Sequence, residues 1–530
     1  MKRPATTDTG EAPRSQSPTT ENIDFSLNHE QPGQWRRIRG GPPSEVSLRA
    51  ARAPVARPRL LAAYLIGTLA AFGGIYAWAL PGVLCGAVLL CGLAPRRPPP
   101  PPHDTHLIDR AIVVVIVAVG LQIVPLPLPL RSVLSPNLAA LESTLFATAA
   151  LEERWSGALS LHPAGTLEAV LLLVATACTY WAARATFSVG GLRTVCRAIA
   201  TAGAVFGTAA IVHRALTPRL IYGFWQPADA GALPLGPVVN RNHFAGWLLM
   251  AGALVAGYLL ASLATRGLFG GQRPRFRRTA VALARSGIAT TGAAWVAITL
   301  TVIAAESRSA ILGLVVAVAA IIKYRARSWR AVATAAGVTV VVAMVSVLSG
   351  QSAVRRIADR FADTPDGSNV SRLVIWRESM PIVNDFWATG VGAGAYGRAM
   401  LTYQRTQLYA SHLGSDRHFN HAHNHYLQLL AEGGVLVVIP VVVLLAAFAR
   451  VVRARLRHDP GEIRTVRAGA VAGLLGIAVQ SVWEVPLTMP AAALLAAALA
   501  AVATHERLPD ARDRGAPLAQ AANRANRIPH

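Results

Sequence analysis

Apolar runs of about 20 residues recur along this chain of 530 residues, and they constrain its fold more than any other feature. A run of about that length is enough for a helix to cross the hydrocarbon core of a bilayer. Only 15% of the residues are charged and 53% are hydrophobic, whereas soluble proteins carry about 25% charged residues. We therefore expect a membrane protein rather than a soluble protein of several domains.

Windows of about 19 residues locate the candidate transmembrane segments. They lie near residues 60–80, 81–95, 110–126, 166–183, 198–213, 243–265, 286–304, 309–322, 331–349, 426–449, 468–485 and 487–504. The second, eighth and last two segments are short. The sequence thus predicts an all-α, polytopic membrane protein with about 12 transmembrane helices, within a range of roughly 10 to 12.

The net charge of +24, from 51 Lys and Arg against 27 Asp and Glu, would suggest nucleic acid as the partner of a soluble protein. Here the basic residues gather in every second loop, which is typical of cytoplasmic loops. These loops span residues 96–97, 184–193, 266–285, 323–330 and 450–467. The charge therefore indicates topology, with both termini in the cytoplasm, and we expect no nucleic-acid partner.

This topology divides the chain into five parts. Residues 1–59 are predicted to be a disordered, basic cytoplasmic tail, and residues 60–349 carry the first nine transmembrane helices. Residues 350–425 are too long and too rich in Gly and aromatic residues for a simple connector, so we expect a mainly helical periplasmic subdomain. The last three helices occupy 426–504, and 505–530 form a second cytoplasmic tail.

Polar motifs concentrate on the outward side of this topology. The 350–425 loop contains Arg372 and Trp376, a Gly-rich stretch at 390–397, and the histidine-rich stretch 421–425 that leads into the tenth helix. Two other outward turns carry charge, at 240–243 and at 306–309. All of these motifs are predicted to reach the same membrane face.

These motifs are similar to those of the O-antigen ligase and polymerase superfamily. The central likeness is His423-Asn424 followed, after nine residues, by Gly434. Motifs similar in kind and order support it: Asn240, Asn242 and His243; Ser307 and Arg308; Arg372 and Trp376 followed by Gly392 and Gly394; and Leu159 to Pro163. The resemblance covers roughly residues 60–500, and Val437 stands where the family often has Gly, Thr or Tyr.

The resemblance implies a glycosyltransferase of the bacterial inner membrane that serves lipopolysaccharide or exopolysaccharide synthesis. Its donor would be a glycan on undecaprenyl pyrophosphate, and its acceptor a lipid or glycan hydroxyl at the periplasmic face. No metal and no cofactor would be needed. The chemistry agrees with this expectation, because a pyrophosphate leaving group is anionic and guanidinium groups bind phosphate through paired hydrogen bonds.

Three residues are predicted to carry the reaction. Arg308, at the start of the eighth apolar segment, and Arg372 are the candidate pyrophosphate ligands, and His423 is the candidate catalytic base. Two alternatives stay open. Arg308 could be an ordinary arginine at the membrane interface, and Arg372 could form a salt bridge within the loop. A metal site is the rival for His423, because His421 and His425 are four residues apart. No Asp-x-Asp or Cys ligand set stands in the outward loops.

Five further residues are candidates for contact with the acceptor or for support of the site: Asn242, His243, Arg377, Asn424 and Glu432. A carboxylate inside an apolar helix, such as Glu432, is expected to be functional. A packing hydrogen bond near Gly433 and Gly434 explains it equally well. For His243, the role of an interfacial anchor is favoured.

Two alternative functions remain at this point. A polymerase that extends the lipid-linked polysaccharide shares the same motifs, so these residues hardly distinguish it from a ligase. A secondary transporter of about twelve helices would use Glu432 as a proton site. The long outward loop, however, separates nine helices from three, and no internal repeat is evident.

Overall fold

The computed structural model describes residues 45–94, 105–147, 157–228, 232, 234–265, 287–326, 368–406, 409–410, 415–416 and 418–506. The chain divides into two units, Met1–Ala50 and Ala51–His530, and only the start of one helix is described in the first. The predicted apolar segment 331–349, most of the predicted N-terminal tail and all but the first two residues of the predicted C-terminal tail lie outside the described residues.

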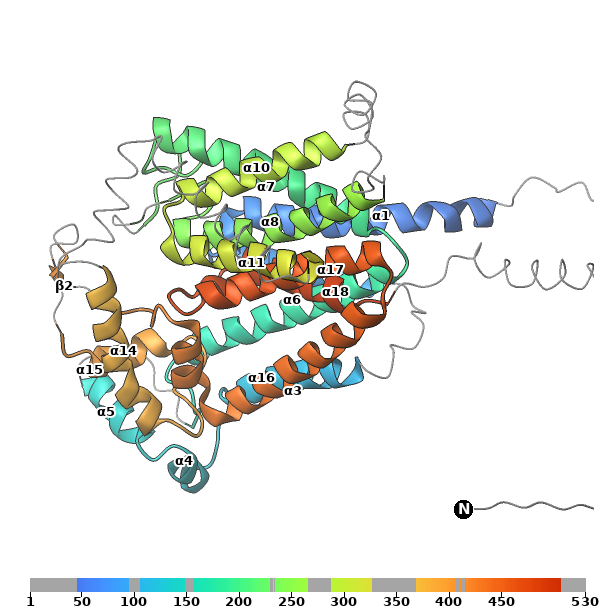
Figure 1. Cartoon of the computed structure of the whole chain (residues 1–530). Helices are drawn as coiled ribbons and strands as arrows, with labels where there is room; N and C mark the ends of the chain where they lie inside the picture. Colours follow the sequence, from blue (N-terminus) through green and yellow to red (C-terminus); the bar gives the residue numbers. More distant parts are fainter. Residues whose placement is uncertain are drawn as a thin grey trace, which may run out of the picture. The chain divides into compact units, whose positions relative to one another are not determined.

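Helices form nearly all the regular structure of the described residues (Figure 1). In chain order they are α1 (Glu45–Ala70), η1 (Phe72–Gly74), α2 (Ala79–Gly92), α3 (His106–Leu121), α4 (Leu128–Leu134), α5 (Leu138–Ala147), α6 (Pro163–Ser188), α7 (Leu192–Leu216), α8 (Arg241–Ala264), α10 (Ile288–Ala304), α11 (Arg308–Ala326), α14 (Ser368–Asp385), α15 (Tyr396–Tyr403), α16 (His425–His458), α17 (Gly461–Gln480), η2 (Pro486–Thr488) and α18 (Pro490–Thr504). The two-residue strands β1 (Tyr409–Ala410) and β2 (Ser415–Asp416) pair antiparallel. Apart from that pair, the all-α prediction is confirmed for these residues.

Each predicted apolar segment that falls within the described residues coincides with a helix. The first helix differs most from its prediction, because α1 begins at Glu45, inside the predicted tail, and ends at Ala70. The helices α4 and α5 were not predicted. The reason is that α4 has only 7 residues and follows a Pro-rich stretch, so no window of membrane-spanning length includes it.

Four described helices are long and apolar enough to cross a membrane: α6, α7, α8 and α16. Three shorter apolar helices, α2, α10 and α18, accompany them. Length and composition therefore support an integral membrane protein. The total of about 12 spans, the orientation and the cytoplasmic termini stay predictions.

The helix α8 is at the centre of the main hydrophobic core. It packs against α7, α10, α11, α17 and α18, and its side chains from Phe244 to Val255 are almost all buried. Trp247 and Met250 are fully enclosed. A helix that is apolar on all sides is either buried among other helices or spans a membrane, and α8 is buried by its neighbours.

Glycines on α17 allow its neighbours to approach closely. A Cβ atom at Gly469 would lie 2.8 Å from the Cα of Gly257 on α8, and one at Gly476 would lie 2.7 Å from the carbonyl oxygen of Gly313 on α11. Small residues at such contacts are the usual device for helix packing in membranes, where burial of apolar area contributes little. The glycines thus fix α17, and the loop that follows it, against α8 and α11.

The helices α3 and α16 run side by side (Figure 1) and expose apolar side chains. On α16, Ile439, Val442 and Leu445 are each about 60% exposed, and on α3 Val113 and Val117 are about half exposed. Such a continuous apolar surface would be unfavourable in water. It is the surface expected to face lipid acyl chains.

A second, smaller hydrophobic cluster is formed by side chains of α5, α14 and α15. Ile375 and Ile382 of α14 pack there with Tyr396 of α15 and with Leu141 and Leu145 of α5. The periplasmic subdomain predicted at 350–425 therefore shares its core with α5, which precedes it by more than two hundred residues.

Candidate functional site

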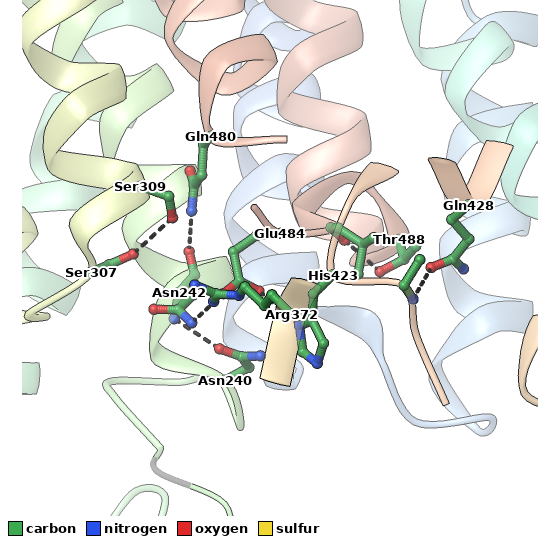
Figure 2. A network of polar contacts seen from close by, with 12 residues as sticks. Asn240, Asn242, Ser307, Ser309, Arg372, His423, Gln428, Gln480, Glu484 and Thr488 are labelled. Carbon is green, nitrogen blue, oxygen red and sulfur yellow. Dashed lines mark hydrogen bonds and ion pairs between the residues drawn. The ribbon is translucent and has the colours of Figure 1, made fainter. Parts of the chain in front are cut away.

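A buried carboxylate, Glu484, gathers residues from three distant parts of the chain (Figure 2). It lies in the loop between α17 and α18 and is 1% exposed. Its Oε1 accepts hydrogen bonds from Asn242 Nδ2 at 2.8 Å and from Arg372 Nη2 at 2.6 Å. Its Oε2 lies 3.6 Å from Nδ1 of His423.

Each of these partners lies at or near a helix end, which explains how the chain brings them together. Asn242 is in the first turn of α8, where its backbone N–H donates to the side chain of the N-cap residue Asn240 at 2.8 Å. His423 immediately precedes Asn424, the N-cap of α16. Arg372 is on α14, which packs against α16. Helix caps hold the backbone at these ends, and so they position the side chains beside them.

The backbone of His423 is strained, and its imidazole is oriented toward Glu484. Its φ of +47° is rare for a residue with a side chain. Both His423 Nδ1 and Glu484 Oε2 are buried, and neither has a hydrogen-bond partner within the described part of the chain. They face each other slightly beyond hydrogen-bonding distance. A small movement would join them, which would fix the proton on Nδ1 and leave Nε2 as the basic nitrogen.

Glu484 remains ionised in these surroundings. Burial alone raises the pKa of the Glu484 carboxyl, but the interactions with His423, Arg372 and His243 outweigh burial, and the pKa lies below its ordinary value. An ionised carboxylate can pair with the Arg372 guanidinium and stabilise a protonated imidazole. The site is therefore an Arg–carboxylate–His arrangement whose imidazole, 28% exposed, is the more accessible member.

The structure locates the other predicted site residues as follows. Arg308 is the first residue of α11 and is half-buried, between the buried residues Ser307 and Ser309. Arg377 is exposed on α14. The side chain of Asn424 accepts hydrogen bonds from the backbone N–H groups of Tyr426 and Leu427, both at 3.0 Å, so its contacts are those of a helix cap.

Glu432 makes a different set of contacts. Its Oε1 accepts from the backbone N–H of Tyr396 at 3.3 Å and from Gln428 Nε2 at 3.1 Å. The second of these donors links it to the start of α16, because Gln428 Oε1 accepts from the backbone of Ala422. These contacts match the packing role that the sequence left open for Glu432.

Gly434, the last residue of the His-Asn motif, breaks α16. Its φ of +52° and ψ of −164° interrupt the helix, and the segment 387–392 crosses at that break. The backbone of Val435 donates to Trp387 O at 2.8 Å, and that of Gly392 donates to Glu432 O at 3.1 Å. A Cβ atom at Gly390 would overlap the carbonyl group of Glu432. The glycines are needed because two backbones cross here without room for side chains.

The side chain of Gln122 forms hydrogen bonds to both of the segments that cross at Gly434. Its Nε2 donates to Thr389 O at 2.7 Å and to Glu432 O at 2.8 Å, and its Oε1 accepts from the backbone of Ala393 at 3.1 Å. The stretch Leu159–Pro163 packs on the other side, where Leu161 N donates to Val391 O at 2.9 Å. The Gly-rich stretch and the Leu159–Pro163 motif therefore form one structural unit.

A second charged group lies at the turn between α10 and α11. Glu306 bonds Arg214 at 2.9 Å and Arg241 at 3.3 Å, and its side chain is 7% exposed. Its φ of +52° is again in the left-handed region. The group joins the end of α7 and the start of α8 to the turn that precedes Arg308.

Sequence reasoning missed Glu484. The signal was available, since Glu484 is an acidic residue at the end of the predicted apolar segment 468–485, where carboxylates are costly and usually functional. The metal alternative gains no support, because the described residues contain no group of three or more His, Cys, Asp or Glu side chains that could hold an ion. His423 instead lies beside the carboxylate of Glu484, which also binds the guanidinium of Arg372.

A comparison with models of protein families gives a match for part of the chain. Residues 293–442 match the family model described as O-antigen ligase. This segment includes Arg308, Arg372, His423 and Gly434, whereas Asn242 and Glu484 lie outside it. The comparison with curated proteins gives no match for this chain. The match confirms, for the segment 293–442, the resemblance to the O-antigen ligase superfamily that the His-Asn motif predicted.

Proposed function

We propose that this protein transfers a glycan from undecaprenyl pyrophosphate to an acceptor hydroxyl at the periplasmic face of the bacterial inner membrane, as an O-antigen ligase does. The family match supports a glycosyltransferase of this superfamily. The observation that carries the proposal is the arrangement of His423 and Arg372 on the buried carboxylate of Glu484.

In the proposed reaction, the acceptor oxygen attacks the anomeric carbon of the donor glycan while His423 Nε2 takes the hydroxyl proton. The bond between the anomeric carbon and the pyrophosphate oxygen breaks, and undecaprenyl pyrophosphate leaves with the bonding electron pair. Glu484 stabilises the imidazolium that forms, as a carboxylate does behind a catalytic histidine. His423 then releases its proton to solvent.

Arg372 and Arg308 are proposed to hold the pyrophosphate. The contact of Arg372 with Glu484 uses Nη2, and a guanidinium has five N–H donors in all. Arg308 begins α11, so a phosphate beside it would also meet the positive end of the helix dipole. Positive charge at the departing oxygens stabilises the transition state more than the bound donor.

Analysis of cells tests this function. Cells that lack the protein would be complemented with the wild type, His423→Ala or Arg308→Ala, and the surface polysaccharide and its lipid-linked precursor would be compared. We expect both variants to be inserted and abundant but inactive, with long polymer retained on the carrier. Single repeat units on the carrier would instead indicate a polymerase. A variant with wild-type polysaccharide would exclude the role proposed for its residue, and unchanged polysaccharide and precursor in cells that lack the protein would contradict glycan transfer altogether.

A further inference from the structure

Six aromatic side chains form a cluster beside the proposed site. This aromatic cluster consists of Phe72, Tyr76, Trp78, Tyr222, Phe224 and Trp225. Phe72 packs edge-on or tilted against four of the others, with ring centroids 5.0 to 6.2 Å apart. The cluster joins the end of α1 to the loop that follows α7.

The cluster exposes rings that a packed core would enclose. Phe224 is 73% exposed, Trp78 59% and Tyr222 39%. Tyr76 and Trp78 lie nearly parallel, with an interplanar angle of 8°. The result is a broad aromatic surface that no described residue covers fully.

The backbone beneath this surface is hydrogen-bonded and strained. Ile221 and Trp225 exchange backbone hydrogen bonds of 2.7 and 2.9 Å, which leaves a three-residue tip at Tyr222–Phe224. Phe72 and Tyr222 have φ values of +57° and +56°, which are rare for aromatic residues. Strain of this kind persists where the surrounding structure enforces it, and it is concentrated at ligand sites.

The cluster lies at the same end of the helices as Glu484. A Cβ atom at Gly73, within the α1–α2 turn, would lie 2.6 Å from Met489 Sδ and 3.5 Å from a methyl group of Val238. Met489 closely follows Glu484 in sequence, and Val238 closely precedes Asn240 and Asn242. The turn that carries Phe72, Tyr76 and Trp78 therefore packs on the two segments that build the site.

The polar ring atoms of Tyr76, Tyr222 and Trp225 already form hydrogen bonds within the protein. Tyr222 Oη donates to the carbonyl of Ala70 at 2.5 Å, and Trp225 Nε1 donates to Tyr76 Oη at 2.8 Å. Aromatic residues at a membrane interface instead direct these atoms toward water and headgroups. The cluster offers ring faces, and the same loop adds the exposed side chains of Arg219 and Gln226.

We infer that the aromatic cluster is a carbohydrate-binding surface on which a pyranose of the transferred glycan stacks. The C–H groups on one face of a pyranose carry partial positive charge and complement the electron-rich face of an aromatic ring. Nearby polar side chains such as Arg219 and Gln226 would bond the sugar hydroxyls. This inference rests on the proposed function, because it supplies the glycan.

Binding measurements on the full-length protein in lipid nanodiscs test the inference. The probe is the water-soluble polysaccharide released by mild acid from the surface of the producing cells. Trp78→Ala and Phe224→Ala are each expected to weaken binding about tenfold, as loss of a central aromatic contact does. The matched control is Trp387→Ala, since Trp387 is 63% exposed but lies outside the cluster.

His423→Ala separates this inference from the proposed function. It should bind the polysaccharide like the wild type although it transfers nothing. If His423→Ala kept its transfer activity while Trp78→Ala lost binding, the catalytic proposal would fail and the binding surface would stand. Wild-type affinity in both cluster variants, or no binding by the wild type, would overturn the inference.

A lipid-quenching measurement tests whether the aromatic cluster contacts the membrane surface instead of the polysaccharide. In nanodiscs of brominated lipid, the fluorescence of Trp78 is obtained as the difference between the wild type and Trp78→Phe. We expect little quenching by the lipid and a change on addition of polysaccharide. Strong quenching by lipid with no response to polysaccharide would identify a membrane contact and overturn the inference.

Discussion

Two glutamates near α16 occupy opposite kinds of surroundings. Glu484 pairs with a guanidinium, an amide and an imidazole, and one of its oxygens has no hydrogen-bond partner within the described residues. Glu432 accepts from a backbone N–H and from a glutamine side chain, at the place where two glycine-containing segments cross.

The difference distinguishes a carboxylate that is suited to catalysis, Glu484, from one that is suited to helix packing, Glu432. A carboxylate whose partners are charged or titratable can change its interactions as a proton moves. One whose partners are neutral donors, on helices fixed by crossing backbones, mainly holds the structure together. The two ends of the His-Asn motif differ in the same way. His423 lies beside Glu484, whereas Gly434 lies where the segment 387–392 crosses α16.

The largest effect on stability is expected where the segment 387–392 crosses α16 at Gly434. Gly390→Ala should destabilise the protein by about 3 kcal/mol or more, because the new Cβ would meet the Glu432 backbone and the φ of +67° disfavours a side chain. Protein abundance and thermal melting in detergent would measure this. The control is Gly292→Ala, where a Cβ meets nothing within 4 Å. Equal melting of the two variants would show that the crossing is not tight.

Glu484→Gln should reduce glycan transfer about 100-fold, a typical effect of removing the group that orients a catalytic side chain. Activity would be divided by the amount of folded protein, measured by melting in detergent on the same preparation. A variant that is merely destabilised would lose activity only in proportion to its abundance. Wild-type transfer per folded molecule would exclude the proposed pairing.

Glu432→Gln should have a smaller effect, confined to stability. The amide oxygen of glutamine can still accept both hydrogen bonds that Oε1 of Glu432 accepts. We therefore expect a loss of only about 1 kcal/mol and transfer within about threefold of the wild type. Melting and transfer would be measured on the same preparation as Glu484→Gln. A loss of transfer as large as that of Glu484→Gln would remove the distinction between the two carboxylates.

Chelation is expected to have no effect. The imidazole of His423 faces the carboxylate of Glu484, and the described residues hold no set of three metal-ligating side chains. Transfer by the purified protein would be measured with and without EDTA. Activity that is lost with EDTA and restored by Zn²⁺ or Mg²⁺ would favour the metal site that the histidine stretch also allowed.

The sequence predicted the helices well and the site in part. Hydrophobic windows locate long apolar helices because the bilayer requires them. They fail at α4, which is short, and at the start of α1, which continues into a basic segment. The His423-Asn424 motif led to the histidine of the site, and Arg372 was already a candidate.

The partner of these residues could not be predicted from spacing. Glu484 is some sixty residues from His423 and far from Asn242 in sequence, and only the packing of α17 on α8 brings them together. Likewise, Glu432 looked functional because it is a carboxylate in an apolar helix. Only the backbone that crosses at Gly434 reveals its donors.

One measurement tests the central claim most directly. The wild type and His423→Ala would be purified into nanodiscs and supplied with extracted lipid-linked glycan and acceptor, and the rate of glycan transfer would be followed. We predict a rate at least about 1,000-fold lower for His423→Ala, within the range expected for loss of a general base, with melting close to that of the wild type. A rate within about tenfold of the wild type would contradict the assignment of His423 as the base.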